Sequence, residues 1–100
     1  MAEFKCYVCN APVKTGEKFT FTKSGSVHFD CFVSTRRRDL PEDKKENLRQ
    51  LSILLDSQLS YLINVLNLKN ETGGRNDTVN TAYKNIEKEC GETTRRISEL

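Results

Sequence analysis

Four side chains that bind metals well lie in the first third of this 100-residue chain. Two residues separate Cys6 from Cys9, two separate His28 from Cys31, and 18 residues lie between the pairs. Structural zinc sites hold Zn²⁺ in a tetrahedron of four Cys or His ligands, commonly supplied as two such pairs. Three cysteines and one histidine fill every position and leave none for a reacting water. The pattern predicts one structural Zn²⁺ held by Cys6, Cys9, His28 and Cys31.

The alternative is a set of buried free thiols beside a core histidine. The chain opens without the apolar segment of a secretory signal peptide, so we expect a cytoplasmic protein. In a reducing cytosol, clustered cysteines are more typical of metal sites than of disulfides. The first 35 residues cannot otherwise build much core, so metal binding should supply folding energy for this part.

The elements around these residues follow from local patterns. Residues 18–23 alternate aromatic and polar side chains, which predicts a strand with Phe19 and Phe21 on one face. Residues 24–26 suit a turn, residues 27–29 a returning strand, and residues 30–38 a helix that begins near Cys31, where the helix N-terminus should favour the thiolate. Asn10 follows Cys9 at a place where a left-handed residue is often needed, and asparagine tolerates that conformation.

Aromatic residues are concentrated in the same part of the chain. They are expected to form a small core around the metal hairpin, although exposed aromatics could instead stack on nucleic-acid bases. The residues concerned are Tyr7, Phe19, Phe21, Phe29 and Phe32.

The composition changes near residue 40, from aromatic-rich to leucine-rich. Asp39 and Glu42 with the intervening Pro41 suggest a capping box that opens a helix over about residues 41–70. Gly73 and Gly74 should end that helix. A second helix, over about residues 76–99, would be capped by Asn76 or Asp77. Its apolar seam recurs every three or four residues, at Val79, Tyr83, Ile86, Cys90, Thr93, Ile97 and Leu100.

These elements predict a small α+β zinc knuckle, a treble-clef-like β-hairpin with a short helix, followed by a long antiparallel helical hairpin. The knuckle would span residues 1–40 and the hairpin residues 41–100, with the hairpin as a dimerisation element. Gly91, a weak helix former, lies within the second predicted helix. Either the helix breaks there, or the glycine allows a close crossing with another helix. Cys90 is expected to be a small buried hydrophobe rather than a reactive thiol.

Two resemblances add to this interpretation. The stretch CYVCN…GEKFTFTKSGSVHFDCF resembles the first zinc module of LIM domains, but no ligands of a second module follow Cys31. Over nearly its whole length the chain, with its LSILLDSQLSYLI and ECGETTR segments, resembles a family of short, functionally uncharacterised archaeal proteins. That resemblance implies a cytosolic archaeal protein with one zinc and supplies no activity.

Charge is unevenly distributed around a net charge of +2. Residues 1–40 carry seven Lys or Arg against four Asp or Glu, so an anionic partner would meet this third of the chain. Arg36, Arg37 and Arg38 are candidate contacts to the phosphates of DNA or RNA. The alternative is a solvated helix end whose cations interact with the helix dipole.

The apolar face of residues 48–68 is wider than one partner helix can cover. Polar residues within it, such as Asp56 and Asn64, argue against a membrane span. Either the knuckle covers the remainder or a second chain does, and two hairpins forming a four-helix bundle is the simplest arrangement.

The sequence contains no nucleophile with a general base and no phosphate-binding glycine loop, so an enzyme is not expected. The favoured interpretation is a non-enzymatic zinc-binding module that associates with nucleic acid or a ribonucleoprotein. The alternative is a protein–protein adaptor that self-associates through its helical hairpin.

Overall fold

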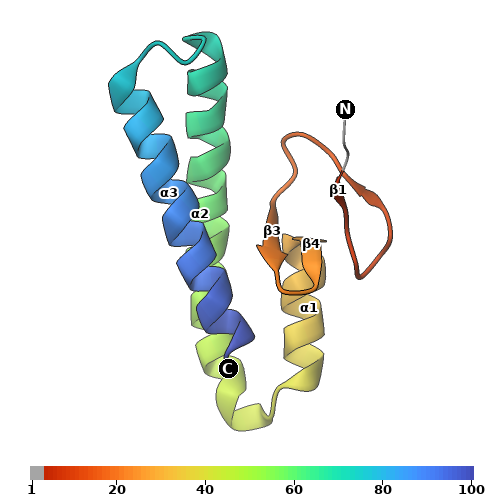
Figure 1. Ribbon diagram of the computed structural model, residues 1–100. Coiled ribbons are helices and arrows are strands. Elements are labelled where there is room, and N and C mark those ends of the chain that lie inside the picture. The colour runs from red at the N-terminus through yellow and green to blue at the C-terminus, as the bar shows by residue number, and fades with distance from the viewer. Residues whose placement is uncertain (1–3) are drawn as a thin grey trace.

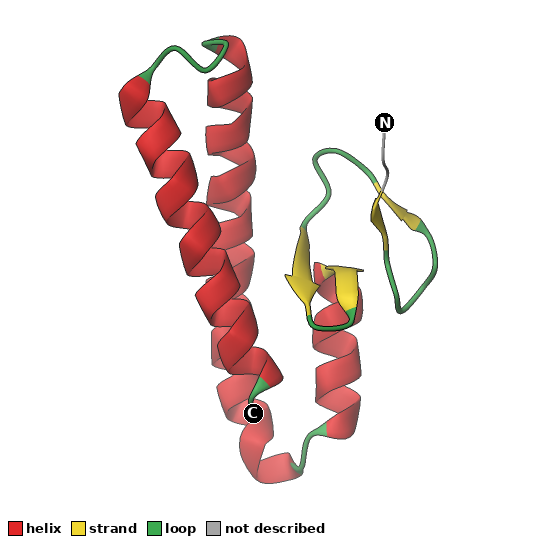
Figure 2. Cartoon of the chain, viewed as in Figure 1, coloured by secondary structure: helices red, strands yellow, loops and turns green. Residues whose placement is uncertain are grey.

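The computed structural model describes residues 4–100 and shows small β-hairpins beside helices (Figures 1 and 2). Along the chain the elements are β1 (Phe4–Lys5), β2 (Pro12–Val13), β3 (Phe19–Thr22), β4 (Gly25–His28), α1 (Phe29–Asp39), the 3₁₀ turn η1 (Glu42–Lys44), α2 (Lys45–Glu71) and α3 (Asp77–Ser98). The predicted fold class, a small α+β unit followed by a long helical hairpin, is confirmed.

Each pair of neighbouring strands forms its own antiparallel hairpin. In the first, Phe4 pairs with Val13, and in the second, Phe19 pairs with His28. The two hairpins are joined by hydrogen bonds: the Tyr7 amide donates to the Ser26 carbonyl at 3.1 Å, and the Ser26 hydroxyl donates to the Lys5 carbonyl at 2.8 Å. These bonds hold the β1–β2 turn against β4.

The predicted capping box at the start of the long helix is wrong. Asp39 is the last residue of α1, and neither η1 nor α2 has a side-chain cap. Pro41 disfavours the helical conformation in the residue before it, and Leu40 is accordingly extended (ψ 146°) and buried in the core. The chain therefore turns at Leu40 and Pro41, passes through η1 and enters α2 at Lys45.

The helices α2 and α3 form the expected hairpin. Gly73 and Gly74 end α2 with positive φ angles of 62° and 77°, and the Asn76 side chain accepts from the Val79 amide to cap α3. The helix runs through Gly91 without a break, and open space surrounds this residue, so no close crossing explains it. On the predicted seam, four residues are buried: Ile86, Cys90, Thr93 and Ile97.

One continuous hydrophobic cluster joins residues 4–40 to the helical hairpin. It includes Val27 and Phe32 from the first part, and Leu48, Leu55 and Ile97 from the helices. Polar contacts add to it: the Thr20 and Thr94 hydroxyls lie 2.7 Å apart, and Lys18 Nζ lies 2.6 Å from Asp56 Oδ1. The β-hairpins and α1 lie beside the helical hairpin of α2 and α3 (Figure 1). The turn between α2 and α3 lies at the opposite end of this helical hairpin from the α1–α2 connection.

By length and composition alone, the helical segment Glu42–Glu71 could cross a membrane, contrary to the expectation from its polar residues. Its partner α3, however, carries charged side chains at most of its exposed positions. The hairpin as a unit is therefore suited to water rather than to hydrocarbon.

Candidate metal centre

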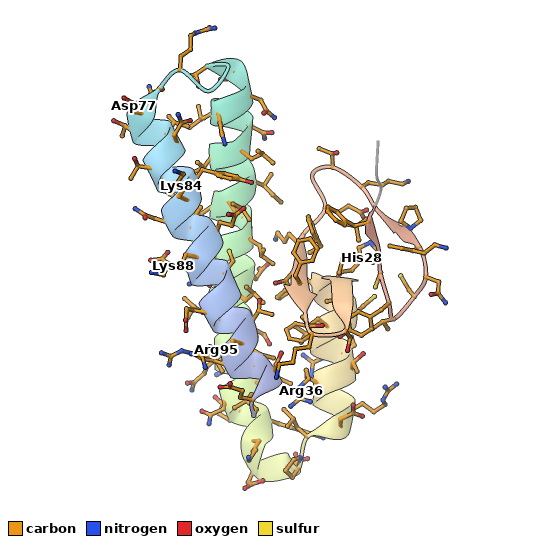
Figure 3. The ribbon with its side chains drawn as sticks, in the orientation of Figure 1. His28, Arg36, Asp77, Lys84, Lys88 and Arg95 are labelled. Carbon is orange, nitrogen blue, oxygen red and sulfur yellow. The ribbon has the colours of Figure 1, made fainter. Side chains whose placement is uncertain are left out.

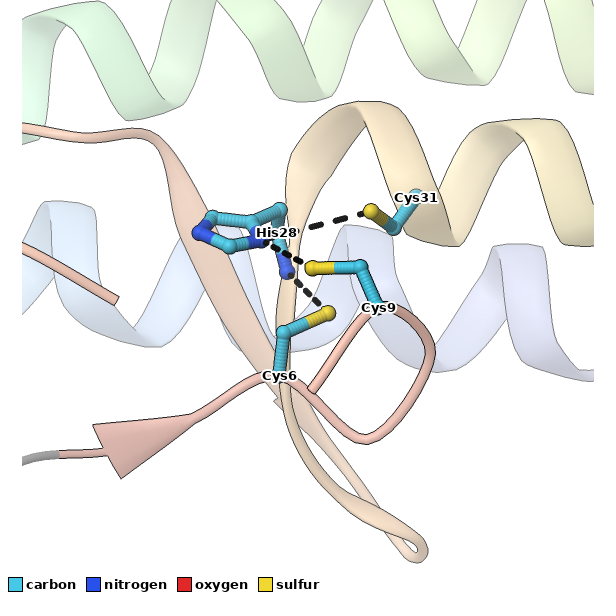
Figure 4. A group of neighbouring side chains, drawn as sticks. All are labelled: Cys6, Cys9, His28 and Cys31. Atoms are coloured by element: carbon cyan, nitrogen blue, oxygen red, sulfur yellow. Dashed lines mark hydrogen bonds between the residues drawn. The ribbon is translucent and has the colours of Figure 1, made fainter. Parts of the chain in front are cut away.

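The structure brings the four predicted ligands together from three places in the chain (Figure 4). Cys6 and Cys9 lie in the turn between β1 and β2, His28 ends β4, and Cys31 lies in the first turn of α1. Their ligand atoms all lie within 4.8 Å of one another. The fold thus joins two short sequence pairs into one site, as the spacing predicts.

The distances within this cluster suit a tetrahedral metal ion. Zn–S bonds of about 2.3 Å and Zn–N bonds of about 2.0–2.1 Å imply S···N edges of roughly 3.6 Å around a tetrahedron. In the structure, His28 Nδ1 lies 3.3 Å from Cys9 Sγ and 4.0 Å from Cys31 Sγ, on either side of that value. The four residues could therefore hold one metal ion with small adjustments of their side chains.

The Cys6–Cys9 turn is shaped by backbone hydrogen bonds. The Asn10 amide donates to the Cys6 carbonyl at 2.8 Å, and Asn10 has the predicted left-handed conformation with φ of 63°. The amide of His28 donates to Cys6 Sγ at 3.4 Å. Burial alone would raise the pKa of the Cys6 thiol, but amide donors from Cys9, His28 and Val8 outweigh it and lower this pKa to about 6. These amide donors therefore favour the thiolate form of Cys6.

Cys31 differs from the expectation that a helix N-terminus would favour its thiolate. Burial, followed by the neighbouring sulfurs of Cys6 and Cys9, raises the pKa of the Cys31 thiol to about 12. With no cation between them, three sulfurs in one small volume do not all carry a charge. Three thiolates can coexist there only around a cation, so the donor set fits a bound metal.

The second ring nitrogen of His28, Nε2, is buried without a hydrogen-bond partner among the described residues, and the residue nearest to it that sequence reasoning missed is Glu17. Nε2 lies 3.6 Å from Glu17 Oε1, and that oxygen accepts the Lys14 amide at 2.7 Å. The Lys14 amide, with a smaller contribution from His28, lowers the pKa of the Glu17 carboxyl. A carboxylate behind a ligating histidine orients the ring and selects its tautomer. In the sequence, the only sign of a carboxylate near the histidine was the presence of Glu17 in the turn after Lys14.

A cavity of about 440 Å³ borders this site on the side of His28 and Cys31. Its wall includes the carboxylates of Glu17, Asp30 and Asp56. Asp56 is already paired with Lys18, and Glu17 with the Lys14 amide and His28. Two of these three carboxylates, Glu17 and Asp56, therefore serve structural contacts.

The aromatic residues are placed differently from the expected core. Phe32 is buried, and Phe19 and Phe29 are partly buried, but Tyr7 and Phe21 are exposed. The reason lies in the alternation of β3: Thr20 faces α3, so Phe19 and Phe21 must face away from the helices.

Phe4, Phe19 and Phe21 form a cluster of their own, here called the aromatic cluster. The ring of Phe4 meets that of Phe21 edge to face at 5.0 Å, and Phe19 meets Phe21 in the same way at 5.4 Å. Phe4 remains 49% exposed and Phe21 54% exposed. This part of the knuckle therefore presents aromatic rings to solvent.

The three arginines at the end of α1 do not form one surface. Figure 3 places Arg36 between α1 and the helical hairpin, and its Nε atom is buried. Arg37 and Arg38 are exposed, and Arg38 Nε lies 3.4 Å from Asp39 Oδ1. Arg37 and Arg38 are thus more accessible to a phosphate than Arg36.

Cys90 lies outside the cluster, in the core between α2 and α3. Burial, followed by the charges of Glu89 and Glu87, raises the pKa of its thiol to about 11. Its burial and high pKa are those of an inert core residue, as predicted.

A family model described as an uncharacterized protein conserved in archaea (DUF2175) matches residues 2–99. The chain therefore belongs to this archaeal family, in agreement with the resemblance seen in its sequence. Neither the curated proteins nor the solved structures include one that matches the chain.

Proposed function

We propose that this protein is a non-enzymatic zinc-binding module that binds single-stranded nucleic acid, alone or within a ribonucleoprotein. The observation that carries the nucleic-acid part is the solvent-exposed aromatic cluster on the basic part of the chain. The site geometry supports the zinc part, and the two parts are tested separately.

Zinc is the metal that best suits three sulfurs and one imidazole nitrogen at tetrahedral distances. Cys6, Cys9, His28 and Cys31 would hold it, and all four positions would be filled by protein. A closed site of this kind stabilises a fold and offers no position for an activated water. His28 would be a ligand and is the chain's only histidine, which supports a role other than catalysis.

Metal analysis tests the zinc proposal. Purified protein should contain one zinc per chain, and Cys31→Ala should lose most of it. Cys90→Ala is the matched control, because it removes a buried thiol outside the cluster and should keep the full zinc content. Equal zinc in the two variants, or iron in place of zinc, would contradict the proposal.

The charge distribution supports an anionic partner for the knuckle. Residues 4–40 carry seven Lys or Arg against three Asp or Glu, a net charge of +4, while residues 41–100 have a net charge of −1. Lys5 adjoins Phe4 in β1, and Lys23 lies two residues after Phe21, both exposed. Basic side chains beside exposed aromatic rings are typical of surfaces that bind single strands by stacking and phosphate contact.

Fluorescence anisotropy with a labelled single-stranded oligonucleotide tests this surface. The affinity should fall steeply with salt, because phosphate contacts release counterions. Phe21→Ala should weaken binding by roughly 5- to 150-fold, since stacking contributes about 1–3 kcal/mol per base. Phe21→Leu keeps apolar bulk without the ring and should weaken binding nearly as much.

A pair of lysine variants controls for charge. Lys5→Ala with Lys23→Ala should reduce both the affinity and its salt dependence, whereas Lys84→Ala with Lys88→Ala, on exposed positions of α3, should not. Absence of binding at low salt, or equal loss in both lysine pairs, would sink the nucleic-acid proposal.

The second candidate is a protein–protein adaptor, favoured by apolar side chains that remain exposed on α2, such as Ile53 and Tyr61. Recovery of partners from native lysate with and without nuclease separates the two. Nuclease-sensitive recovery would favour nucleic acid, and nuclease-resistant recovery would favour the adaptor.

A further inference from the structure

The exposed side of α2 differs sharply in charge from that of α3. Between residues 50 and 68, Asp56 is the only charged residue, and it pairs with Lys18 of the knuckle. The exposed positions of this stretch are uncharged: Ile53, Leu54, Ser57, Tyr61, Asn64, Asn67 and Leu68. On α3, by contrast, exposed positions include Lys84, Glu87, Lys88, Glu89, Glu92, Arg95 and Arg96, of which Figure 3 marks three.

Three of the exposed apolar residues recur at intervals of seven. Leu54 is 48% exposed, Tyr61 52% and Leu68 48%. Seven residues are close to two helical turns, so these side chains form a line along one side of α2. We name Leu54, Tyr61 and Leu68 the α2 stripe.

Among the described residues 4–100, the other elements leave about half of each side chain of this stripe exposed. The contacts with α3 and the knuckle bury Leu48, Leu55, Leu59 and Val65, which lie on other sides of α2. Only 22% of the most apolar 18-residue window of this helix is buried within the chain. A surface helix that faces only water normally carries charges opposite its core side, as α3 does.

Depletion of charge around exposed aromatic and aliphatic residues is the compositional mark of a protein–protein interface core. The exposed positions of this stretch offer no cation to the phosphates of a nucleic acid. Two copies of an uncharged surface, by contrast, can approach each other without repulsion between like charges. The stripe therefore favours a second copy of the chain as its partner.

The order of residues within the stripe also matches a two-fold axis. Leu54 and Leu68 lie at equal distances in sequence, seven residues, on either side of Tyr61. In an isologous dimer, residue i contacts residue j and j contacts i. With two α2 helices antiparallel and Tyr61 at the axis, each Leu54 meets Leu68 of the second copy.

We propose that the chain forms an antiparallel dimer in which the α2 stripes of two copies pack against each other about Tyr61. The two hairpins then make a four-helix arrangement, with the charged sides of α3 left in water. This inference is independent of the nucleic-acid proposal, and it would place two zinc knuckles in one particle.

Light scattering of the zinc-loaded full chain over a range of concentrations tests the dimer. Wild-type protein should have about twice the chain mass of 11.5 kDa. Tyr61→Glu should be monomeric, because two carboxylates would face each other at the axis. The control Asn85→Glu places the same charge at an exposed position of α3 and should stay dimeric. A monomeric wild type, or a Tyr61→Glu dimer, would overturn the proposal.

Cross-linking tests the arrangement without a disruptive charge. With a short bifunctional thiol reagent, Leu54→Cys mixed with a mass-tagged Leu68→Cys should give the mixed product, and Tyr61→Cys should cross-link to itself. Leu54→Cys alone should react far less. Self-cross-linking of Leu54→Cys that equals the mixture would overturn the antiparallel arrangement.

A vesicle experiment separates the dimer from a membrane-facing role of the same stripe. Phosphatidylcholine vesicles sedimented with the protein should leave the wild type in the supernatant as a dimer. Sedimentation of the protein with the vesicles, reduced by Tyr61→Glu, would overturn the dimer as the occupant of the stripe.

Discussion

At the scale of single residues, the two nitrogens of the His28 ring differ in their surroundings, and Nε2 is buried without a hydrogen-bond partner in residues 4–100. Nδ1 faces the sulfurs of Cys9 and Cys31, and Nε2 faces Glu17 at 3.6 Å. The Lys14 amide fixes the glutamate in turn, at 2.7 Å. Glu17 thus lies on the Nε2 side of the imidazole, away from the sulfurs.

Glu17→Gln should weaken metal binding by about 10-fold, at the low end of the 10- to 100-fold cost typical of such changes. Glutamine can still accept the Lys14 amide but carries no charge to support the imidazole. Competition with a chromophoric chelator measures the affinity. Asp30→Asn, in the wall of the same cavity, is the control and should change it little. An equal loss of metal affinity in the two variants would show that the negative charge near the site matters, and not the position of Glu17 behind His28.

The contact between the Thr20 and Thr94 hydroxyls has a defined direction. The Thr94 hydroxyl donates to the Cys90 carbonyl at 2.8 Å, so Thr20 must donate to Thr94 across the 2.7 Å contact. Both side chains are buried. This bond joins β3 to α3.

Thr94→Val should destabilise the fold more than Thr20→Val. The first change leaves the buried Thr20 donor unpaired, at a cost of about 1–3 kcal/mol, whereas the second leaves the Thr94 donor satisfied by Cys90. Urea unfolding of both variants measures the difference. The double valine variant should resemble Thr20→Val, because no donor is then stranded at the contact. An equal loss in both single variants would contradict the assigned direction.

At the scale of elements, Gly74 and Gly91 both have open space where a Cβ atom would lie, but they differ in backbone conformation. Gly91 lies inside α3 and Gly74 follows α2 with φ of 77°, and a Cβ atom at either position would meet open space. Only the backbone conformation distinguishes them.

Gly91→Ala should stabilise the protein by about 1 kcal/mol, because alanine loses less conformational freedom in a helix. Gly74→Ala should destabilise it by about 1–2 kcal/mol, since an L-residue is strained in the left-handed conformation. Thermal unfolding followed by circular dichroism at 222 nm compares the two. The same sign of change in both variants would show that backbone conformation does not decide the effect.

At the scale of the whole molecule, residues 4–40, which carry the candidate metal ligands, share one core with the helices. Phe32 and Leu40 of the first part belong to the same buried cluster as Leu48 and Ile86 of the hairpin. Loosening the first part therefore removes packing from the second. The stability of the helices should depend on the metal site although none of its ligands lies on α2 or α3.

A metal chelator should lower the unfolding midpoint of the helices, measured at 222 nm where α2 and α3 dominate the signal. Metal that binds only the folded state stabilises it, so removal withdraws that free energy from the shared core. Cys31→Ala, already unable to hold the metal, should show no further change with chelator. Helices that melt at the same temperature with and without chelator would show that the two parts unfold independently.

The sequence by itself determined the local features. Spacing identified Cys6, Cys9, His28 and Cys31 as one cluster, and periodicity identified the two long helices with the Gly73–Gly74 break between them. These signals are local: ligand pairs come from tight turns, and helical faces repeat every three to four residues. Family membership was also visible in the sequence and agrees with the match over residues 2–99.

Tertiary structure alone decided which face each element presents and to what. Alternation in β3 could not say that Thr20, not Phe21, faces the helices, because that choice depends on Thr94, 74 residues away. In the same way, only packing shows that Arg36 Nε is buried while Leu54, Tyr61 and Leu68 remain about half exposed. Which side chains become buried depends on how segments distant in the sequence pack against each other. A local sequence pattern contains no information on that packing.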